Sequence, residues 1–549
     1  MQDETFDVAV VGFGPTGAVA AGLLGGYGLS TFVCDRAREV YDKPRAIALD
    51  HEIMRVFQQL GVAEAIAPFT EPFTDSCHYG VDGGLIRRMS TVPPPYPLGW
   101  HPSLVFSQPP VEAILREHAQ NLPGVEVALG TTLTGYAQDA DGVTLHLQDD
   151  AGATRTVRAR YLVGCDGASS TVRERAGIAL EDLGFDEPWL VVDVRVNASG
   201  LAKLPVTSVQ YCEPERPSSF IIGPGNHRRW EISINAGEDP AHVATPEGTW
   251  GLLARWLTPD DATLWRQASY RFHALVADRW RDGRVFVAGD AAHQQPPFLG
   301  QGMCQGVRDV ANLAWKLAAV IGGEADAALL DTYGIERKGH VIALTTRIKH
   351  IGQAIGVRDP DAARARDARL RAESSGVVRP TPRQEVQPAL AEGLLDATPH
   401  PANGTLFPQP WVLRADAAAA AATTTLRDGT TPHEGTTPRD DATRRDGTTL
   451  REGAPQRMDA VAGTGWRLVV AANAHLPVAA GKLPARATVL QLGTPALTEA
   501  DGVLAAWFVR HACAAALVRP DHYVYGVARD AAQLETMLEN LQHQLKRGE

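Results

Sequence analysis

The residues best suited to chemistry near the start of the chain are a glycine-rich turn and a carboxylate that follows it. The turn consists of Gly12, Gly14, Pro15, Thr16 and Gly17. At this spacing the first glycine permits a tight turn, the second admits a pyrophosphate to the backbone, and the third lets helix and strand pack closely. Asp35 follows about 20 residues later, where a carboxylate accepts hydrogen bonds from a ribose and repels a 2′-phosphate. The spacing predicts a site for FAD or NAD and does not choose between them.

Two further aspartates stand beside glycines, each at the end of an apolar run. Asp166 precedes Gly167, and Asp290 follows Gly289. A carboxylate at the carboxyl end of a parallel strand lies where such sheets bind ligands, and it can accept hydrogen bonds from several hydroxyls. The alternative for each aspartate is a helix cap without a ligand.

A second glycine-rich segment precedes an apolar helical pattern over residues 307–318. It contains Pro297, Gly300, Gly302 and Met303. The pattern predicts a helix that begins here, and the free N–H groups and dipole at a helix start favour negative charge. The alternative is a glycine hinge without an electrostatic role.

These residues must be positioned by alternating strands and helices. Short β-branched runs alternate with helical patterns over residues 1–350, which is typical of an α/β or α+β protein. Residues 351–414 predict a helical connection. Residues 415–457 hold a polyalanine run and Arg-Asp-Gly-Thr-Thr repeats without apolar periodicity, which predicts a flexible insertion. Apolar runs resume at Trp466, and residues 458–549 predict a small βαβ-type domain that ends in an amphipathic helix.

Composition restricts the class of protein. A chain of 549 residues is too long for one core, and a net charge of −12 argues against nucleic-acid binding. The six cysteines lack CxxC or metal-like spacing, so we expect free thiols in a reducing compartment and no metal site. The acidic N-terminal segment is unlike a signal peptide, and no run of about 20 apolar residues predicts a membrane span. We therefore expect a soluble, cytoplasmic protein.

The combined pattern resembles the single-component flavin-dependent aromatic hydroxylases, the class A flavoprotein monooxygenases. Within that family, five segments are similar to the 3-(3-hydroxyphenyl)propionate hydroxylases: Tyr41-Asp-Lys-Pro-Arg-Ala, Leu49-Asp-His-Glu, Phe106-Ser-Gln-Pro, Arg228-Arg-Trp-Glu and Leu517-Val-Arg-Pro-Asp-His-Tyr-Val. The resemblance covers most of residues 5–350 and resumes at about 463–527. The insertion at 415–457 departs from the family pattern but lies outside these segments.

The resemblance implies an α/β fold with three parts. A Rossmann-like FAD-binding domain would comprise residues 1–185 and 270–350. It would be interleaved with a mixed-sheet substrate domain over 186–269, with further substrate-domain strands near 75–110. A C-terminal thioredoxin-like domain would occupy residues 458–549. Because that domain lacks a CxxC pair, we expect it to serve packing or homodimer contact and not dithiol chemistry.

The resemblance also implies which residues hold the cofactor. The glycine turn, Asp35 and Arg36 would bind the ADP half of FAD, and Asp290 would accept hydrogen bonds from the ribityl hydroxyls. Asp166 would serve flavin positioning and nicotinamide access, and the helix start near residue 300 would favour the anionic reduced flavin ring. The implied cofactor-binding set is Gly12, Gly14, Pro15, Thr16, Gly17, Asp35, Arg36, Arg45, Gln108, Asp166, Gly289, Asp290, Pro297, Gly300, Gly302 and Met303.

The reaction implied by the resemblance is a monooxygenation. NADH or NADPH would dock transiently and reduce FAD, and O2 would then give a flavin C4a-hydroperoxide, which needs an electron-rich ring. A phenol meets that need when a base draws on its proton. We expect a phenolic acid such as 3-(3-hydroxyphenyl)propionate, hydroxylated ortho to its hydroxyl in aromatic catabolism. The alternatives are a larger polyketide-type aromatic, a simple phenol or resorcinol, and a non-catalytic flavin-binding protein. A flavin halogenase is disfavoured because its Trp-x-Trp-x-Ile-Pro signature is missing.

Three residues are candidates for contact with the reacting ring. Arg229 could pair with a substrate carboxylate. His51 could act as a phenol-side base or flavin-edge group, and His293 could sit near the ring. The alternatives are an arginine on the protein surface and two histidines that serve packing.

Overall fold

The computed structural model describes residues 5–414, 454–477, 482–484, 487–494 and 497–546. The chain divides into two compact units, a larger one of residues 1–92 and 101–393 and a smaller one of residues 93–100 and 394–549. Residues 415–453 of the predicted insertion at 415–457 lie outside the described residues. The last two residues of that predicted range, Gln456–Arg457, form strand β22. Within the described ranges, no helix combines the length and the apolar composition that a bilayer crossing requires.

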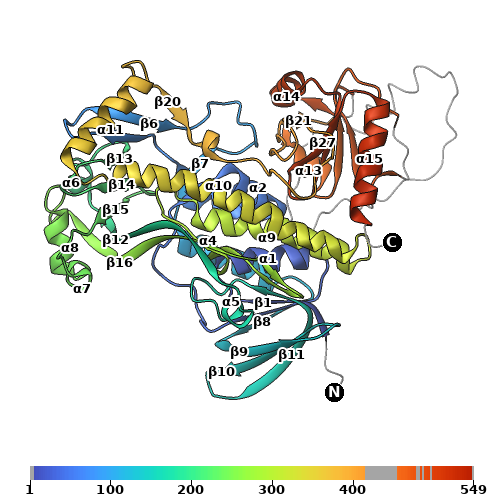
Figure 1. The fold of residues 1–549 in the computed structure, drawn as a ribbon, viewed down its shortest axis with the longest axis horizontal. Coiled ribbons are helices and arrows are strands. Elements are labelled where there is room, and N and C mark those ends of the chain that lie inside the picture. Colours follow the sequence, from blue (N-terminus) through green and yellow to red (C-terminus); the bar gives the residue numbers. More distant parts are fainter. Residues whose placement is uncertain (1–4, 415–453, 478–481, 485–486, 495–496, 547–549) are drawn as a thin grey trace. The chain divides into compact units, whose positions relative to one another are not determined.

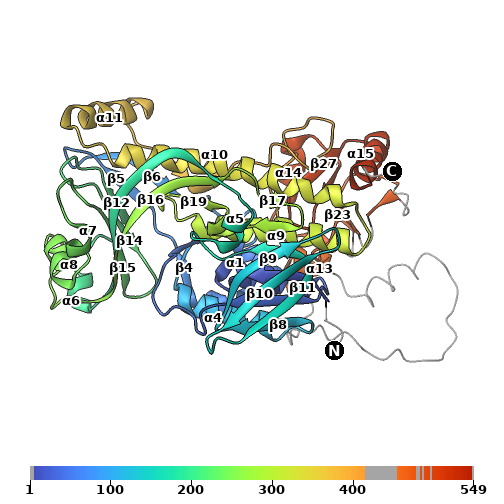
Figure 2. The same ribbon diagram turned by 60° about the horizontal axis from the view of Figure 1, so that its bottom comes forward.

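The larger unit contains a mostly parallel sheet with the strand order β17-β18-β11-β1-β2-β8. These strands are β1 (Thr5–Val11), β2 (Thr31–Asp35), β8 (Val125–Leu129), β11 (Thr154–Gly164), β17 (Arg281–Asp282) and β18 (Val285–Val287). The antiparallel strands β9 (Thr131–Gln138) and β10 (Val143–Asp149) continue from β11 (Figure 2). Because the winding direction reverses at β1, ligands are expected outside the carboxyl ends of its strands.

Two helices pack against α1 (Pro15–Gly26) beside this sheet. α1 contacts both α4 (Gln108–Gln120) and α9 (Gly302–Ile321), as Figure 1 shows. Gly17, Ala18 and Ala21 are buried in α1, and these small residues allow the close approach of its neighbours. The start of α1 thereby becomes fixed next to the start of α9.

A second sheet has nine strands in the order β19-β16-β12-β15-β14-β13-β5-β6-β20. They are β5 (Ser76–Tyr79), β6 (Leu85–Ser90), β12 (Leu180–Val196), β13 (Ser208–Tyr211), β14 (Ser218–Ile222), β15 (His227–Ser233), β16 (Ala262–Ala277), β19 (His293–Gln294) and β20 (Pro380–Pro382). One face buries Trp230 and Ile232 in a core with α7 (Pro240–Val243) and α8 (Pro246–Leu253). Side chains alternate along a strand, so the residues on either side of Trp230 and Ile232 in β15 face the opposite side of the sheet.

The domain boundaries in the structure differ from those expected from the sequence. The long antiparallel strands β12 and β16 carry the second sheet from residue 180 to 277, beyond the predicted 186–269. β5 and β6 join this sheet, whereas β7 (Ser103–Phe106) pairs with β3 (Ala48–Asp50) and β4 (Thr70–Pro72) in a sheet of their own.

The predicted boundary at residue 350 falls inside a helix. α10 (Asp331–Ile355) continues through it because Ile348, Ile351 and Ile355 extend its buried apolar face. α11 (Pro360–Glu373) then follows within the predicted connection.

The smaller unit has a four-stranded sheet in the order β24-β23-β26-β27. These strands are β23 (Arg467–Val470), β24 (Thr488–Gln491), β26 (Ala515–Val518) and β27 (Val524–Ala528). β23 runs parallel to β24 and antiparallel to β26. The helices α14 (Val503–His511) and α15 (Ala531–Leu545) accompany the sheet, and Trp507 of α14 enters its core. All six cysteines of the chain are free thiols.

Candidate active site

The glycine turn between β1 and α1 has the geometry that its spacing predicts. Gly12 has a φ of +95°, and a β-carbon there would overlap the carbonyl oxygen of Cys165. A β-carbon at Gly17 would overlap the carbonyl oxygen of Gly12. A β-carbon at Gly14, in contrast, would enter open space. Two of the three glycines are therefore required by the fold, and Gly14 keeps the backbone accessible to a ligand.

Asp35 closes this turn from the end of β2. Its Oδ2 accepts a hydrogen bond from the backbone N–H of Phe13 (2.6 Å), and its Oδ1 accepts one from that of Ala37 (2.7 Å). Asp35 lies in the wall of a cavity of about 420 Å³, which we call the Asp35 cavity. Of the predicted cofactor residues, its wall includes Gly12, Gly14, Asp35, Arg36, Arg45 and Asp166.

A second cavity of about 440 Å³, the Asp290 cavity, lies between the starts of α1 and α9 and the second sheet. The two cavities share Gly14, Arg45 and Tyr270 in their walls, so they adjoin. The predicted residues in the wall of the Asp290 cavity are Gly14, Pro15, Thr16, Arg45, Gln108, Arg229, Asp290, Pro297, Gly300, Gly302 and Met303. The structure thus brings together residues that are up to about 290 positions apart in the chain.

Asp290 faces this cavity. Its carboxylate makes no hydrogen bond or ion pair within the described part of the chain, and its side chain is exposed toward the cavity. The protein around the cavity desolvates the group and raises the pKa of Asp290, against the opposing effect of His293 and Arg45. An unpaired carboxylate in such a wall is an acceptor for the hydroxyls of a ligand.

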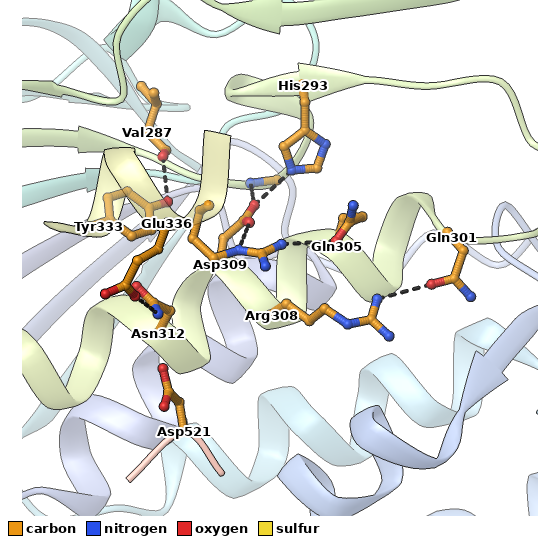
Figure 3. A network of polar contacts seen from close by, with 12 residues as sticks. Val287, His293, Gln301, Gln305, Arg308, Asp309, Asn312, Tyr333, Glu336 and Asp521 are labelled. Atoms are coloured by element: carbon orange, nitrogen blue, oxygen red, sulfur yellow. Dashed lines mark hydrogen bonds and ion pairs between the residues drawn. The ribbon is translucent and has the colours of Figure 1, made fainter. Parts of the chain in front are cut away.

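The turn that carries Asp290 is held from behind by a buried polar network (Figure 3). Asp309 of α9 accepts a hydrogen bond from the backbone N–H of Gly289 (3.0 Å), and Arg337 Nε donates to Asp309 Oδ1 (2.9 Å). Gly289 has a φ of +62°, and a β-carbon there would press on Thr16 of α1. The network therefore fixes the Gly289-Asp290 turn against the start of α1.

The two histidines proposed from the sequence do not line either cavity. His293 Nε2 lies 2.7 Å from Asp309 Oδ2, and its ring stacks on Trp280 at 5.5 Å between centroids. His51 is buried at the start of α2 (His51–Gln59), where desolvation lowers the pKa of its ring to about 4. In this structure both histidines lie outside the two cavity walls, and their contact with the reacting ring stays a prediction.

Asp166 has a capping role and also borders a cavity. It accepts hydrogen bonds from the Ser170 hydroxyl and from the backbone N–H of Val172 (3.1 Å) at the start of α5 (Thr171–Arg175). Burial raises the pKa of Asp166, although these hydrogen bonds oppose the rise. The position of Asp166 is compatible with both interpretations from the sequence, a helix cap and a residue that lines the cofactor site.

Gln108 and Arg229 fix the loop that carries Arg45. Gln108 Oε1 accepts from the backbone N–H groups of Arg45 (3.1 Å) and Ala46 (2.6 Å). Arg229 Nη1 donates to the carbonyl oxygen of Arg45 (2.8 Å), and its Nε and Nη2 grip both carboxylate oxygens of Asp193 (2.7 and 2.9 Å). Burial opposes the ionisation of Asp193, but the Arg229 charge and the hydrogen bonds from His227 and Arg229 together lower the pKa of that carboxyl. Arg229 is therefore a structural cation in the cavity wall, not a free one.

Glu231 is a wall residue that the sequence analysis missed. It lies on β15 two positions after Arg229, on the cavity side of the strand, whereas Trp230 and Ile232 point into the opposite core. The Arg228-Arg-Trp-Glu segment resembles the family pattern as a whole, and strand alternation separates its two cavity-facing residues, Arg229 and Glu231, from the other two. That alternation was the available indication.

The residues around the two cavities fit FAD. The open face of Gly14 admits a pyrophosphate, Asp35 borders the first cavity, and the unpaired Asp290 borders the second. The 20-residue helix α9 starts at Gly302, and its first residues line the Asp290 cavity. This positive helix end can stabilise negative charge on a bound ring system.

Comparison with known proteins agrees with this geometry. Residues 5–348 match the family described as FAD binding domain, and residues 448–544 match the HcaD C-terminal domain. A probable NADH-specific resorcinol 4-hydroxylase from Rhodococcus jostii is 37% identical over 98% of this chain and 95% of its own length. A 3-(3-hydroxy-phenyl)propionate/3-hydroxycinnamic acid hydroxylase from Mycobacterium sp. (strain JLS) is 32% identical over 99% of this chain and 93% of its own.

Solved structures share the same fold. The complex of aklavinone-11 hydroxylase with FAD and aklavinone superimposes with a TM-score of 0.74 and 25% identity, covering 99% of this chain and all of the other. The flavin-dependent monooxygenase PieE, solved with FAD and substrate, gives a TM-score of 0.77 at 22% identity over 99% of this chain and all of PieE.

Proposed function

This chain belongs to the FAD-binding-domain family of flavin-dependent aromatic hydroxylases, and we propose that it hydroxylates a small phenolic ring, ortho to an existing hydroxyl, with NADH and O2. The observation that carries the proposal is the pair of adjoining cavities. One is bordered by the glycine turn and Asp35, and the other by Asp290, the start of α9 and the second sheet. A dinucleotide can extend across both and leave its reactive end beside a substrate.

We assign the binding of FAD to the predicted cofactor residues. The glycine turn, Asp35 and Arg36 would hold the ADP half, and Asp290, with the segment from Pro297 to Met303, would hold the other half. When bound, FAD supplies the redox chemistry that accepts reducing equivalents from the nicotinamide and activates O2. The chain itself positions the ring, excludes water and supplies hydrogen-bond partners.

The size of the Asp290 cavity favours a single aromatic ring. Its volume of about 440 Å³ must accommodate both the flavin ring and the substrate. The apolar side of this cavity is formed by Phe272 and Pro297, beside a buried cluster that contains Trp189 and Phe298. These features support a small phenol over a polyketide-type aromatic with several fused rings. The NADH preference is proposed from the similarity to the resorcinol 4-hydroxylase.

The strand order of the smaller unit supports the thioredoxin-like assignment of the C-terminal domain. A parallel pair, β23 and β24, followed by the antiparallel strands β26 and β27, is the arrangement expected of that fold. Cys513 has no cysteine neighbour in sequence, so we assign this domain to packing or to contact with a second copy and not to dithiol chemistry.

The proposal is tested with the purified full-length chain. We expect yellow protein with stoichiometric FAD, NADH oxidation that phenols stimulate, and an oxygenated product identified by mass spectrometry. Resorcinol, 3-(3-hydroxyphenyl)propionate and 3-hydroxybenzoate form the substrate panel. If the protein binds FAD but no phenol stimulates NADH oxidation or gives an oxygenated product, the proposed function is wrong.

A further inference from the structure

Glu231 is a buried carboxylic acid in the wall of the Asp290 cavity, and its side chain has no partner in the described part of the chain. Its side chain is on the cavity face of β15, and the residue is only 3% exposed. Within the described ranges of the chain, its carboxylate makes no hydrogen bond and no ion pair. A buried carboxylate without a partner is costly, and such groups in a ligand cavity commonly bind a polar group of the ligand.

Two of the three arginines in the described cavity wall are hydrogen-bonded to carboxylates. In the described part of the wall the arginines are Arg45, Arg229 and Arg271. Arg229 is gripped by Asp193 through two hydrogen bonds, and Arg271 forms the same two-point contact with Asp186 (2.9 and 2.8 Å). Arg45 makes a longer contact, 3.8 Å to Glu112, and its side chain is 52% exposed. A substrate carboxylate placed beside Glu231 would therefore meet Arg229, whose charge Asp193 already balances.

We propose that Glu231 accepts the hydrogen bond of a substrate hydroxyl and takes its proton during hydroxylation, and that the cavity consequently selects a neutral, hydroxyl-bearing ring over one that carries a carboxylate. This inference rests on the proposed phenol hydroxylase function and deepens it. It assigns the phenol-side base to Glu231, a role that neither His51 nor His293 is positioned to fill.

The proton step is balanced within the substrate and the protein. The phenolic O–H bond breaks, and its electron pair stays on the substrate oxygen, from which it is delocalised to the ortho and para carbons. The proton forms a new O–H bond on the carboxylate of Glu231. The ring becomes more electron-rich at the position where the family's reaction adds oxygen, and the proton later returns to solvent.

The surroundings of Glu231 suit this exchange. Burial raises the pKa of Glu231 to about 7, with Asp193 of β12 adding to the rise and Arg229 of its own strand opposing it. From β16, Tyr270 and His273 line the same cavity, and Asp290 borders it from the turn after β18. On the neighbouring strand β14, the residue paired with Glu231 is the neutral Ser219. A base with a pKa near the working pH can both accept and release a proton readily.

The sign of the pH dependence follows from the active form of Glu231. Only the ionised carboxylate accepts the proton, so kcat/KM should rise about tenfold per pH unit below pH 7 and level off above it. A carboxamide in its place neither ionises nor accepts a proton.

The test compares Glu231→Gln and Glu231→Asp with the wild-type chain, all loaded with FAD. Glu187→Gln is the matched control, because Glu187 is a carboxyl of the neighbouring strand β12 whose pKa burial also raises, and it does not line the Asp290 cavity. The readouts are FAD content, the affinity for resorcinol and for 3-(3-hydroxyphenyl)propionate by calorimetry, and kcat/KM from pH 5.5 to 8.5.

We expect Glu231→Gln to keep its FAD, to lose roughly 100-fold or more in kcat/KM for resorcinol, and to lose the rise with pH. Glu231→Asp should keep that rise, and Glu187→Gln should match wild type. Wild type should bind resorcinol at least roughly tenfold more tightly than 3-(3-hydroxyphenyl)propionate.

Two results would overturn the inference: an unchanged pH profile in Glu231→Gln, or a wild-type preference for the propionate substrate. Failure of the proposed function looks different, because then wild type yields no oxygenated product from any phenol. In that case the calorimetric binding measurements still test the role of Glu231. Tenfold weaker resorcinol binding by Glu231→Gln supports it, and equal or undetectable binding by both proteins contradicts it.

Discussion

His293 Nε2 lies 2.7 Å from Asp309 Oδ2, the oxygen that also accepts the backbone N–H of Gly289. A single buried carboxylate oxygen thus connects the histidine to the turn that presents Asp290. Arg337 balances the charge of Asp309 from α10. His293 therefore belongs to the support of the cavity, one layer behind its wall.

Replacement of Asp309 should destabilise the protein. Asp309→Asn leaves the buried Arg337 without its countercharge, and removal of one partner of such a pair costs about 3–5 kcal/mol. The measurement is the free energy of unfolding in urea, with FAD content as a second readout. Asp361→Asn breaks an exposed pair with Arg364 and should change the stability by less than about 1 kcal/mol. Equal stabilities of the two variants would show that the Asp309 network contributes little.

Asp290→Ala should weaken FAD binding while the fold is retained. Asp290 contributes no hydrogen bond to the described protein, so its loss removes only acceptors for the ligand. Charge-assisted hydrogen bonds of this kind contribute about 1.5–3 kcal/mol, which corresponds to roughly a 10- to 100-fold higher Kd for FAD. Fluorescence titration of the apoprotein measures this change. Asp182→Ala, on β12 and outside both cavity walls, is the control, and wild-type FAD affinity in Asp290→Ala would contradict the role.

Two alanine substitutions in the glycine turn should have opposite consequences. Gly17→Ala places a β-carbon against the carbonyl oxygen of Gly12, so it should lower the melting temperature by several degrees or prevent folding. Gly14→Ala meets no protein atom, so the apoprotein should melt as wild type while FAD binds at least roughly tenfold more weakly. Melting curves with and without FAD separate the two effects. A destabilised Gly14→Ala apoprotein would mean that its β-carbon is not in open space.

The buried His51 should make stability depend on pH. Desolvation lowers its pKa from 6.5 to about 4, so the unfolded chain binds the proton more tightly than the folded chain does. The stabilisation is complete above pH 6.5 and declines as the pH falls toward 4, by roughly 3 kcal/mol in total. His51→Gln should reduce this acid slope when unfolding is measured in urea between pH 7 and 4. His78, whose pKa burial lowers to about 3, should leave a residual slope. If His51→Gln and wild type share one slope, His51 does not titrate in this range.

The sequence predicted those parts of the site that depend on local backbone constraints. The positions of Gly12 and Gly17 are dictated by contacts within one turn, and the place of Asp35 at the end of β2 follows from the apolar run before it. Spacing alone was enough for these residues. The same reasoning located the start of α9 and the apolar strands of the smaller unit.

The surroundings of His293 and Glu231 depend on contacts between distant segments. His293 is three residues from Asp290, yet it points to Asp309, which is 16 residues further along the chain. Glu231 became visible only once β15 was paired with β12 and β14, because its face of the sheet is set by that pairing. Residue type gives the chemistry available, and the register of the sheet decides which side chains reach the cavity.

The bonds of Arg229 have a consequence for how such an enzyme can acquire a new substrate. Its guanidinium holds Asp193 of one strand and the carbonyl oxygens of Pro44 and Arg45 in a loop more than 180 residues away. Mutation of Arg229 would therefore break contacts between β12 and this loop, so it would lower the stability of the fold in addition to any change in substrate preference. The side chain of Glu231, in contrast, makes no hydrogen bond or ion pair in the described chain. Its replacement removes no contact that holds the fold, so specificity can diverge at this position with the smallest loss of stability.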